Sequence, residues 1–214
     1  MSLRDQIEKL KQDMSGQTPP DVQQAMQQAA EVLKQSGISD HSLKAGDAVP
    51  DFTLPDAKGG NVHLAGALTQ GPVVLSFYRG GWCPYCNLEL QALQQALPEI
   101  QELGAQLVAV SPELPDQTLS TTEKHALAFA VCSDTGNRVA RDFGIVFTLP
   151  EILRPIYAKF GIDLPAWNGD GSFELPVPAT YVLDRNGIIL DGFVNTDYMQ
   201  RMEPERIIDI LRNN

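Results

Sequence analysis

The sequence predicts an α/β domain preceded by an N-terminal helical extension. From Ala45 onward, short apolar runs alternate with stretches of helical periodicity, a pattern typical of α/β folds with parallel crossovers. Residues 1–40 instead have helical periodicity throughout. We therefore expect an extension over residues 1–42 and one domain over residues 43–214, long enough to bury a hydrophobic core.

The extension is predicted to form two amphipathic helices separated by residues 16–20. Thr18, followed by Pro19 and Asp21, matches an N-cap, a proline at the first helical position and an acidic residue in the first turn. The glutamine-rich polar face is expected to be solvated, with a partner or dimer contact as the alternative. The apolar stripes consist of Leu3, Ile7, Leu10 and Met14 in the first helix and Val22, Met26, Ala29, Ala30 and Leu33 in the second.

Strands and helices then alternate along the domain. The expected elements are strands at 73–78, 106–111 and 128–132, helices from Cys86 to Gly104, at 116–126 and at 136–143, a hairpin of 179–184 with 188–193, and a closing helix at 203–211. Turn residues at 185–187 fit the tip of the hairpin. The crossover between the first two strands is expected to be right-handed.

The excess of acidic residues argues against two classes of binding partner. The chain has 16 Lys and Arg against 27 Asp and Glu, a formal net charge of −11. This charge opposes binding to nucleic-acid phosphates or anionic lipid. The N-terminus lacks the apolar core of a signal peptide, and no apolar run is long enough to span a bilayer. We therefore expect a cytoplasmic protein with no nucleic-acid or membrane partner.

The chemistry is predicted to lie in the segment Cys83-Pro84-Tyr85-Cys86, which follows the first strand and opens a helix. The free N–H groups and positive dipole end of a helix N-terminus stabilise a thiolate, the reacting species in disulfide and peroxide chemistry. A second thiol one turn further on can close an internal disulfide. Three cysteines are too few for a structural disulfide framework in a reducing compartment. The C-x-x-C pair is therefore expected to be catalytic or metal-binding.

The layout of the chain resembles the thioredoxin superfamily, because a strand, a C-x-x-C at the next helix start and a later proline before a hairpin occur in that order. Several segments resemble the peroxiredoxin branch, of the alkyl hydroperoxide reductase and thiol-specific antioxidant type. These segments are Gly46–Leu54, Val74–Arg79, Val108–Glu113 and Thr180–Asp184. The resemblance implies a thioredoxin-like fold, with a central mixed β-sheet flanked by helices, over about residues 45–211.

The peroxiredoxin pattern P-x-x-x-T-x-x-C places its peroxidatic cysteine at Cys86. Arg79, Cys83 and Pro178 stand where the pattern has Pro, Thr and Arg, so the usual donors to the peroxide oxygens are missing. The resemblance implies a peroxide-reducing antioxidant enzyme in which Cys86 attacks and becomes a sulfenic acid, which Cys83 resolves to a disulfide. It also implies a thioredoxin- or glutathione-type reductant, no cofactor and a possible homodimer.

Two other functions stay open from the sequence. A thioredoxin-like protein disulfide reductase would use Cys83 as the nucleophile and Cys86 to resolve the mixed disulfide. A non-catalytic redox sensor or zinc-stabilised binding module would use the C-x-x-C as half of a zinc site, with His125 and Cys132 as the other half. We expect no metal, because structural zinc sites pair two tight ligand clusters and these two residues are well separated.

Five residues are predicted to contact the substrate. Arg79 can supply a cation beside the thiols, and Trp82 and Tyr85 flank them. The resemblance implies that the Val177–Pro178 bond is cis and faces the dithiol, where Val177 offers backbone groups to a peptide.

Residues 148–176 have no regular pattern, and a loop of this length is usually a lid or a binding element. We expect it to border the dithiol. Its aromatic residues are Tyr157, Phe160, Trp167 and Phe173.

Overall fold

The centre of the molecule is a five-stranded mixed sheet with the order β5-β4-β3-β8-β9. The structure is a computed structural model that describes residues 1–16 and 18–214. Strands β3, β4 and β5 are parallel, whereas β8 is antiparallel to β3 and β9 to β8. Their bounds are β3 (Val73–Phe77), β4 (Gln106–Ser111), β5 (Ala130–Ser133), β8 (Ala179–Leu183) and β9 (Ile189–Val194). The expected strands and hairpin are confirmed, with ends that move by one or two residues.

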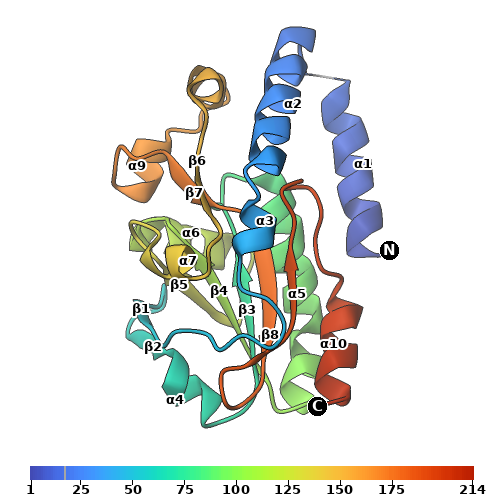
Figure 1. The fold of residues 1–214 in the computed structure, drawn as a ribbon, viewed down its shortest axis with the longest axis vertical. Helices are drawn as coiled ribbons and strands as arrows, with labels where there is room; N and C mark the ends of the chain where they lie inside the picture. The colour runs from blue at the N-terminus through green and yellow to red at the C-terminus, as the bar shows by residue number, and fades with distance from the viewer. Residues whose placement is uncertain (17) are drawn as a thin grey trace.

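Alternate residues of each strand face two separate cores. Helices cover both faces of the sheet (Figure 1). One core lies under α5 (Pro84–Glu102), α10 (Pro204–Arg212) and α1 (Leu3–Ser15), and includes both Cys83 and Cys86. The other lies under α3 (Ile38–His41), α4 (Leu64–Leu68) and α7 (Arg138–Asp142), and includes Cys132. Cys132 is therefore separated from the dithiol by the sheet.

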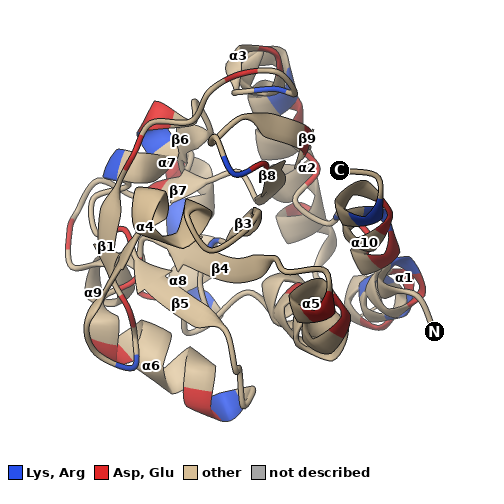
Figure 2. Ribbon diagram, turned by 90° about the horizontal axis from the view of Figure 1, so that it is seen from below, with Lys and Arg blue, Asp and Glu red and all other residues tan. Residues whose placement is uncertain are grey.

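Strands β3, β4, β5 and β8 carry no charged residue, whereas the helices and connections around them do (Figure 2).

One further helix and a small two-stranded hairpin also belong to this part of the molecule. Helix α6 (Pro115–Lys124) packs along β5, and a small hairpin joins β1 (Thr53–Pro55) to β2 (Asn61–His63). In the part of the chain that the structure describes, no helix is long and apolar enough to cross a membrane.

The extension forms the two predicted helices, α1 and α2 (Pro20–Gln35). Leu3 and Ile7 are buried in the core beside the dithiol, and the carboxylate of Glu203 accepts hydrogen bonds from the backbone N–H groups of Leu3 and Arg4 at 3.1 and 2.7 Å. The predicted N-cap is wrong: α2 begins at Pro20, and the Thr18 hydroxyl donates to the carbonyl of Met14. Ala30 is exposed rather than part of the buried stripe.

Residues 148–176 are more regular than the sequence predicts. They contain η1 (Glu151–Leu153), α8 (Arg154–Lys159), α9 (Leu164–Asn168) and β7 (Glu174–Pro176), which pairs with β6 (Val146–Thr148). Each helix is too short to produce a clear periodicity, so the sequence pattern does not reveal it. Their shared core of Leu149, Leu153, Tyr157, Leu164 and Leu175 also receives Ala25 and Ala29 of α2.

Candidate active site

The dithiol lies where β3 passes into α5. The backbone N–H of Cys83 donates to the carbonyl of Gly80 at 3.0 Å, which closes a turn at the helix start. Gly80 has φ +151°, and a Cβ there would lie 2.3 Å from the indole nitrogen of Trp82, so only glycine fits. Cys83 is the N-cap residue, Pro84 is the first residue of α5, and Cys86 lies in its first turn. The spacing in the sequence therefore predicts the position of both sulfurs correctly.

Both thiols are reduced and fully buried, and Arg79 contacts the first of them. Nη2 of Arg79 donates to Sγ of Cys83 at 3.2 Å, and Nη1 donates to the hydroxyl of Tyr157 at 3.2 Å. The guanidinium also lies over the ring of Tyr198, 4.1 Å from its centroid, and 5.2 Å from that of Trp82. With 5% of its surface exposed, Arg79 is a buried cation held against the sulfur.

This environment lowers the pKa of Cys83 well below its usual value. Burial alone raises that pKa, but a hydrogen bond from the Cys86 thiol and the charges of Arg79 and Arg201 outweigh it. Within the described residues, no helix N–H caps the sulfur; the Asn87 N–H bonds to the Cys83 carbonyl instead. The thiolate is therefore stabilised chiefly by a neighbouring thiol and by arginines, rather than by the capping geometry that the sequence suggests.

The pKa of Cys86 is shifted in the opposite direction. Burial, the hydrogen bond to Cys83 and the charge of Cys83 raise the pKa of Cys86 well above its usual value, and Arg201 and Arg79 only partly oppose this. The pair therefore favours a thiolate on Cys83 and a protonated thiol on Cys86. A thiolate beside a thiol is the arrangement that an internal disulfide exchange uses.

A buried ion pair between Arg201 and Glu89 lies against Cys86. Arg201, in the connection between β9 and α10, donates Nη2 to Sγ of Cys86 at 3.5 Å and Nε to the carboxylate of Glu89. The side chains of both ion-pair partners are 2% exposed. The hydroxyl of Thr180 donates to the second oxygen of Glu89 at 3.2 Å, so the carboxylate fixes Arg201 to both α5 and β8.

Glu113, just after β4, holds the turn that leads to Cys83. Its carboxylate accepts a hydrogen bond from the Gly81 N–H at 2.9 Å and one from the Ser111 hydroxyl at 3.3 Å. Burial raises the pKa of Glu113 to about 7, although these two hydrogen bonds oppose the shift. A titratable group therefore supports the backbone two residues before Cys83.

Comparison with known proteins identifies the family of this chain. The AhpC/TSA family matches residues 45–191, more than half of the chain. The chain belongs to the AhpC/TSA family. The predicted peroxiredoxin-like resemblance and the thioredoxin-like fold are thereby confirmed.

Individual relatives of this AhpC/TSA protein include plant peroxiredoxins. The chloroplastic peroxiredoxin Q of Arabidopsis thaliana is 30% identical over 182 residues, which are 81% of this chain and 71% of the relative. That of Gentiana triflora is 29% identical over 167 residues, which are 78% of this chain; the chain spans 64% of its length. The solved structure of peroxidoxin BcpB from Mycobacterium tuberculosis has a TM-score of 0.63 at 25% identity, over 80% of this chain and 97% of that one.

The predicted contacts Trp82 and Tyr85 lie beside the thiols of this AhpC/TSA protein. Trp82 packs edge-on to Tyr157, and Tyr85 edge-on to Tyr198, each with 5.7 Å between ring centroids. Tyr157 thus brings the segment 148–176 to the dithiol, whereas Phe160 is half exposed. Phe173 lies under the guanidinium of Arg154 at 4.3 Å, and the half-buried Trp167 accepts a hydrogen bond at its carbonyl from the Leu114 N–H.

The expected cis bond is wrong, because Val177–Pro178 is trans. Val177 is 1% exposed and packs in the core on the far face of the sheet from the cysteines, and Pro178 is also buried. Trans is the more stable isomer of an X-Pro bond, and the chain enters β8 here without a cis turn. A substrate contact at these two residues stays a prediction.

The predicted zinc partners are not brought to the dithiol of this AhpC/TSA protein. Cys132 lies across the sheet, and Nδ1 of His125 hydrogen-bonds to the amide of Gln91 at 2.9 Å. No group of three His, Cys, Asp or Glu side chains within residues 1–16 and 18–214 is arranged to hold a metal.

Sequence reasoning missed Arg201, Glu89 and Glu113. Arg201 follows Cys86 by 115 residues and belongs to no motif. It reaches the sulfur because the connection between β9 and α10 passes beside α5 in the folded chain. Glu89 carried a weak signal, since it is a charged residue at a position where the helix pattern predicts burial, whereas Glu113 lies two residues beyond the predicted strand and carried none.

Proposed function

We propose that this chain is a thiol peroxidase whose Cys83–Cys86 dithiol reduces peroxides and becomes a disulfide. The observation that carries the proposal is the buried Arg79 guanidinium on the Cys83 sulfur, with the Cys86 thiol beside it. Membership of the AhpC/TSA family and the likeness to peroxiredoxin Q support the same reaction. In this proposal the guanidinium stabilises the negative charge that develops on the peroxide, and it partly replaces the Thr and Arg donors that the family pattern would supply.

The reaction balances with the groups present. The Cys83 thiolate attacks the terminal oxygen of the peroxide; an S–O bond forms, the O–O bond breaks, and the departing alkoxide or hydroxide takes a proton from water. The Cys86 thiol then condenses with the Cys83 sulfenic acid, which forms the S–S bond and releases water. Two electrons pass from the dithiol to the peroxide.

This assignment reverses the roles that the family pattern predicts for the two cysteines. The opposite pKa shifts of Cys83 and Cys86 support Cys83 as the attacking sulfur. The closer arginine contact supports it as well, because Arg79 approaches Cys83 at 3.2 Å, whereas Arg201 is shared with Glu89 and lies 3.5 Å from Cys86.

The turnover partner is proposed to be a thioredoxin- or glutathione-type reductant, which would attack the disulfide and regenerate both thiols. A homodimer through the N-terminal helices and a cytoplasmic location are also proposals. The reducible dithiol supports the proposed reductant, because thiol–disulfide exchange would return both cysteines to the thiol state.

Single-turnover kinetics tests the function. Reduced protein mixed with hydrogen peroxide is expected to lose two titratable thiols per peroxide, with a rate well above that of a free thiol. Cys132→Ala is the control, because Cys132 lies across the sheet. A rate equal to that of free cysteine in both proteins would contradict a peroxidase function.

A protein disulfide reductase is the second candidate, because the same Cys83 thiolate could attack a disulfide. The complete burial of both sulfurs weighs against it, since a folded protein substrate needs an exposed nucleophile. If Cys86→Ser protein accumulates mixed disulfides with a disulfide-bonded substrate faster than it consumes peroxide, this second function is correct.

A further inference from the structure

The Arg79 guanidinium holds a tyrosine hydroxyl beside the sulfur of Cys83. Its Nη2 donates to Sγ of Cys83 and its Nη1 donates to the hydroxyl oxygen of Tyr157, each at 3.2 Å. A guanidinium is planar, and its nitrogens form a rigid fork. The phenol oxygen and the sulfur therefore lie side by side, on neighbouring nitrogens of one cation.

The hydroxyl of Tyr157 is free to donate its own proton. Its oxygen accepts the hydrogen bond from Arg79, and among the described residues this is the only hydrogen bond that the hydroxyl makes. An arginine has no acceptor atom, so the phenol proton is not bound to the cation. It is available to a molecule that enters beside the sulfur.

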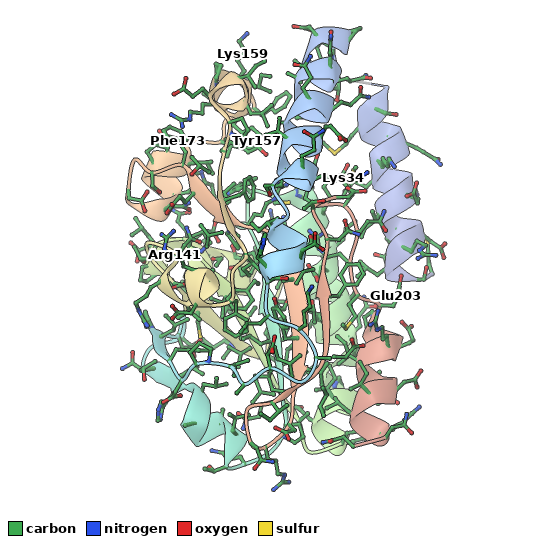
Figure 3. The ribbon with its side chains drawn as sticks, in the orientation of Figure 1. Lys34, Arg141, Tyr157, Lys159, Phe173 and Glu203 are labelled. Carbon is green, nitrogen blue, oxygen red and sulfur yellow. The ribbon has the colours of Figure 1, made fainter. Side chains whose placement is uncertain are left out.

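Packing fixes the ring of Tyr157 in this position. Tyr157 lies between α8 and α2 in Figure 3, and it shares a core with Ala25 and Ala29 of α2. Its ring also packs edge-on to Trp82, and the residue is 8% exposed. Tyr157 and Arg79 line the same cavity of about 480 Å³, so a small molecule can reach both groups.

The other acidic groups of this region are placed less well to donate a proton there. Tyr198 presents the face of its ring, rather than its hydroxyl, to Arg79. Glu113 is fully buried and does not line the cavity. The ring of His41, which does line it, lies against Gly37 at the end of α2. The second thiol of the pair is hydrogen-bonded to the thiolate itself.

A proton is needed where the peroxide bond breaks. Attack of the Cys83 thiolate leaves negative charge on the departing oxygen, as hydroxide or alkoxide. The sulfur is fully buried, so an unprotonated hydroxide beside it is costly. A phenol is a much stronger acid than water or an alcohol, so transfer of its proton to the departing oxygen is favourable.

We propose that Tyr157 is the catalytic acid of the peroxidase reaction and gives its hydroxyl proton to the departing oxygen. The inference rests on the proposed peroxidase function and adds a residue to its first step. The S–O bond forms at Cys83, the O–O bond breaks, and the departing oxygen leaves as water or an alcohol with the proton of Tyr157. The remaining phenolate is paired with Arg79, and it takes a proton back from water before the next turnover.

Oxidants with different leaving groups test the proposal. Tyr157→Phe keeps the ring beside Trp82 and removes the hydroxyl. In stopped flow, its oxidation by hydrogen peroxide is expected to be about 100-fold slower than that of the wild type, the lower part of the range for general acids. Its reactions with peracetic acid, which releases acetate, and with iodoacetamide, which releases iodide, are expected to be nearly unchanged, because these weakly basic groups depart without a proton.

Tyr181→Phe is the matched control. Tyr181 is a buried tyrosine whose ring packs on the other face of the sheet, so all three rates are expected to stay the same. Circular dichroism and thermal melting verify the folds. Heavy water gives a second measurement on the wild-type protein alone. Oxidation by hydrogen peroxide is expected to be slower in heavy water, because a proton moves in that step, whereas the rate with peracetic acid should not change.

The possible outcomes separate the acid role from a positioning role and from the function itself. Equal slowing of Tyr157→Phe with all three reagents would show that Tyr157 only positions Arg79, and the acid role would be wrong. An unchanged rate with hydrogen peroxide, or no isotope effect in the wild type, would also overturn it and leave the peroxidase function intact. A wild type no faster with hydrogen peroxide than free cysteine would overturn the peroxidase function, and the acid role with it.

Discussion

Nη2 of Arg79 lies 3.2 Å from Sγ of Cys83, four residues further along the chain. The chain between them turns at Gly80, so that the arginine points back toward the helix start that carries the sulfur. Tyr157 and Tyr198 hold the guanidinium from two further segments. The cation is therefore part of the resting site and needs no substrate to bring it there.

Replacing Arg79 by Met is expected to raise the pKa of Cys83, because the variant loses both the charge and the hydrogen bond that stabilise the thiolate. Ultraviolet absorbance of the thiolate as a function of pH measures this directly. Arg154→Met, which removes an arginine from the ring of Phe173, is the control. An unchanged titration in the Arg79 variant would show that this arginine does not stabilise the thiolate.

The two cysteine variants distinguish the attacking sulfur. Cys86→Ser is expected to react once with peroxide and stop at a sulfenic acid on Cys83, because no resolving thiol remains. Cys83→Ser is expected to react slowly, since burial still raises the pKa of Cys86 after the charge of Cys83 is removed, and Arg79 donates to the sulfur that has been replaced. Trapping with dimedone and mass spectrometry identifies the modified residue. The reverse result would restore Cys86 as the peroxidatic cysteine, as the family pattern predicts.

The ion pair of Arg201 with Glu89 is expected to be important for stability. Arg201→Met leaves the carboxylate of Glu89 buried without its cation, at a cost of roughly 3–5 kcal/mol in the free energy of unfolding. Arg206→Met breaks a solvent-exposed pair with Asp191 and is expected to cost less than about 1 kcal/mol. Urea denaturation of the two variants gives the comparison. Equal losses would mean that the buried pair is no more important than the surface pair.

Glu113 is expected to make stability depend on pH. Its pKa of about 7 exceeds the ordinary value of 4.5, so the folded state holds the proton more tightly than the unfolded state. Stability should therefore fall as pH rises between these two values, by roughly 3 kcal/mol in total. Glu113→Gln cannot ionise and should lack this loss, whereas Glu102→Gln, an exposed control, should retain it. Parallel stability curves for wild type and Glu113→Gln between pH 4.5 and 7 would exclude the effect.

The sequence predicts those features that depend on local pattern. Apolar runs and turn residues reveal the strands and the hairpin, and the C-x-x-C after a strand places both sulfurs at a helix start. The residues that tune these sulfurs come from distant segments: Arg201 from the connection before α10, Glu113 from the end of β4, and Tyr157 from α8. Their positions depend on tertiary packing, which leaves no periodic signal.

The trans Val177–Pro178 bond illustrates a second limit. The resemblance indicates where a proline falls in the chain, but it does not fix the isomer of the peptide bond before it, and trans is the more stable isomer of an X-Pro bond. Likewise, short helices such as α8 and α9 are stabilised by their shared core with α2 rather than by their own length.

The connection between β9 and α10 contacts both the start of α1 and the sulfur of Cys86. Glu203 holds the N-terminus of α1, and Arg201, two residues before it, contacts Cys86. Helix α1 is thus hydrogen-bonded to the same connection that contacts the sulfur of Cys86. A change at the start of α1 therefore reaches the surroundings of Cys86 through Glu203 and Arg201, even though α1 lies outside the region that matches the family.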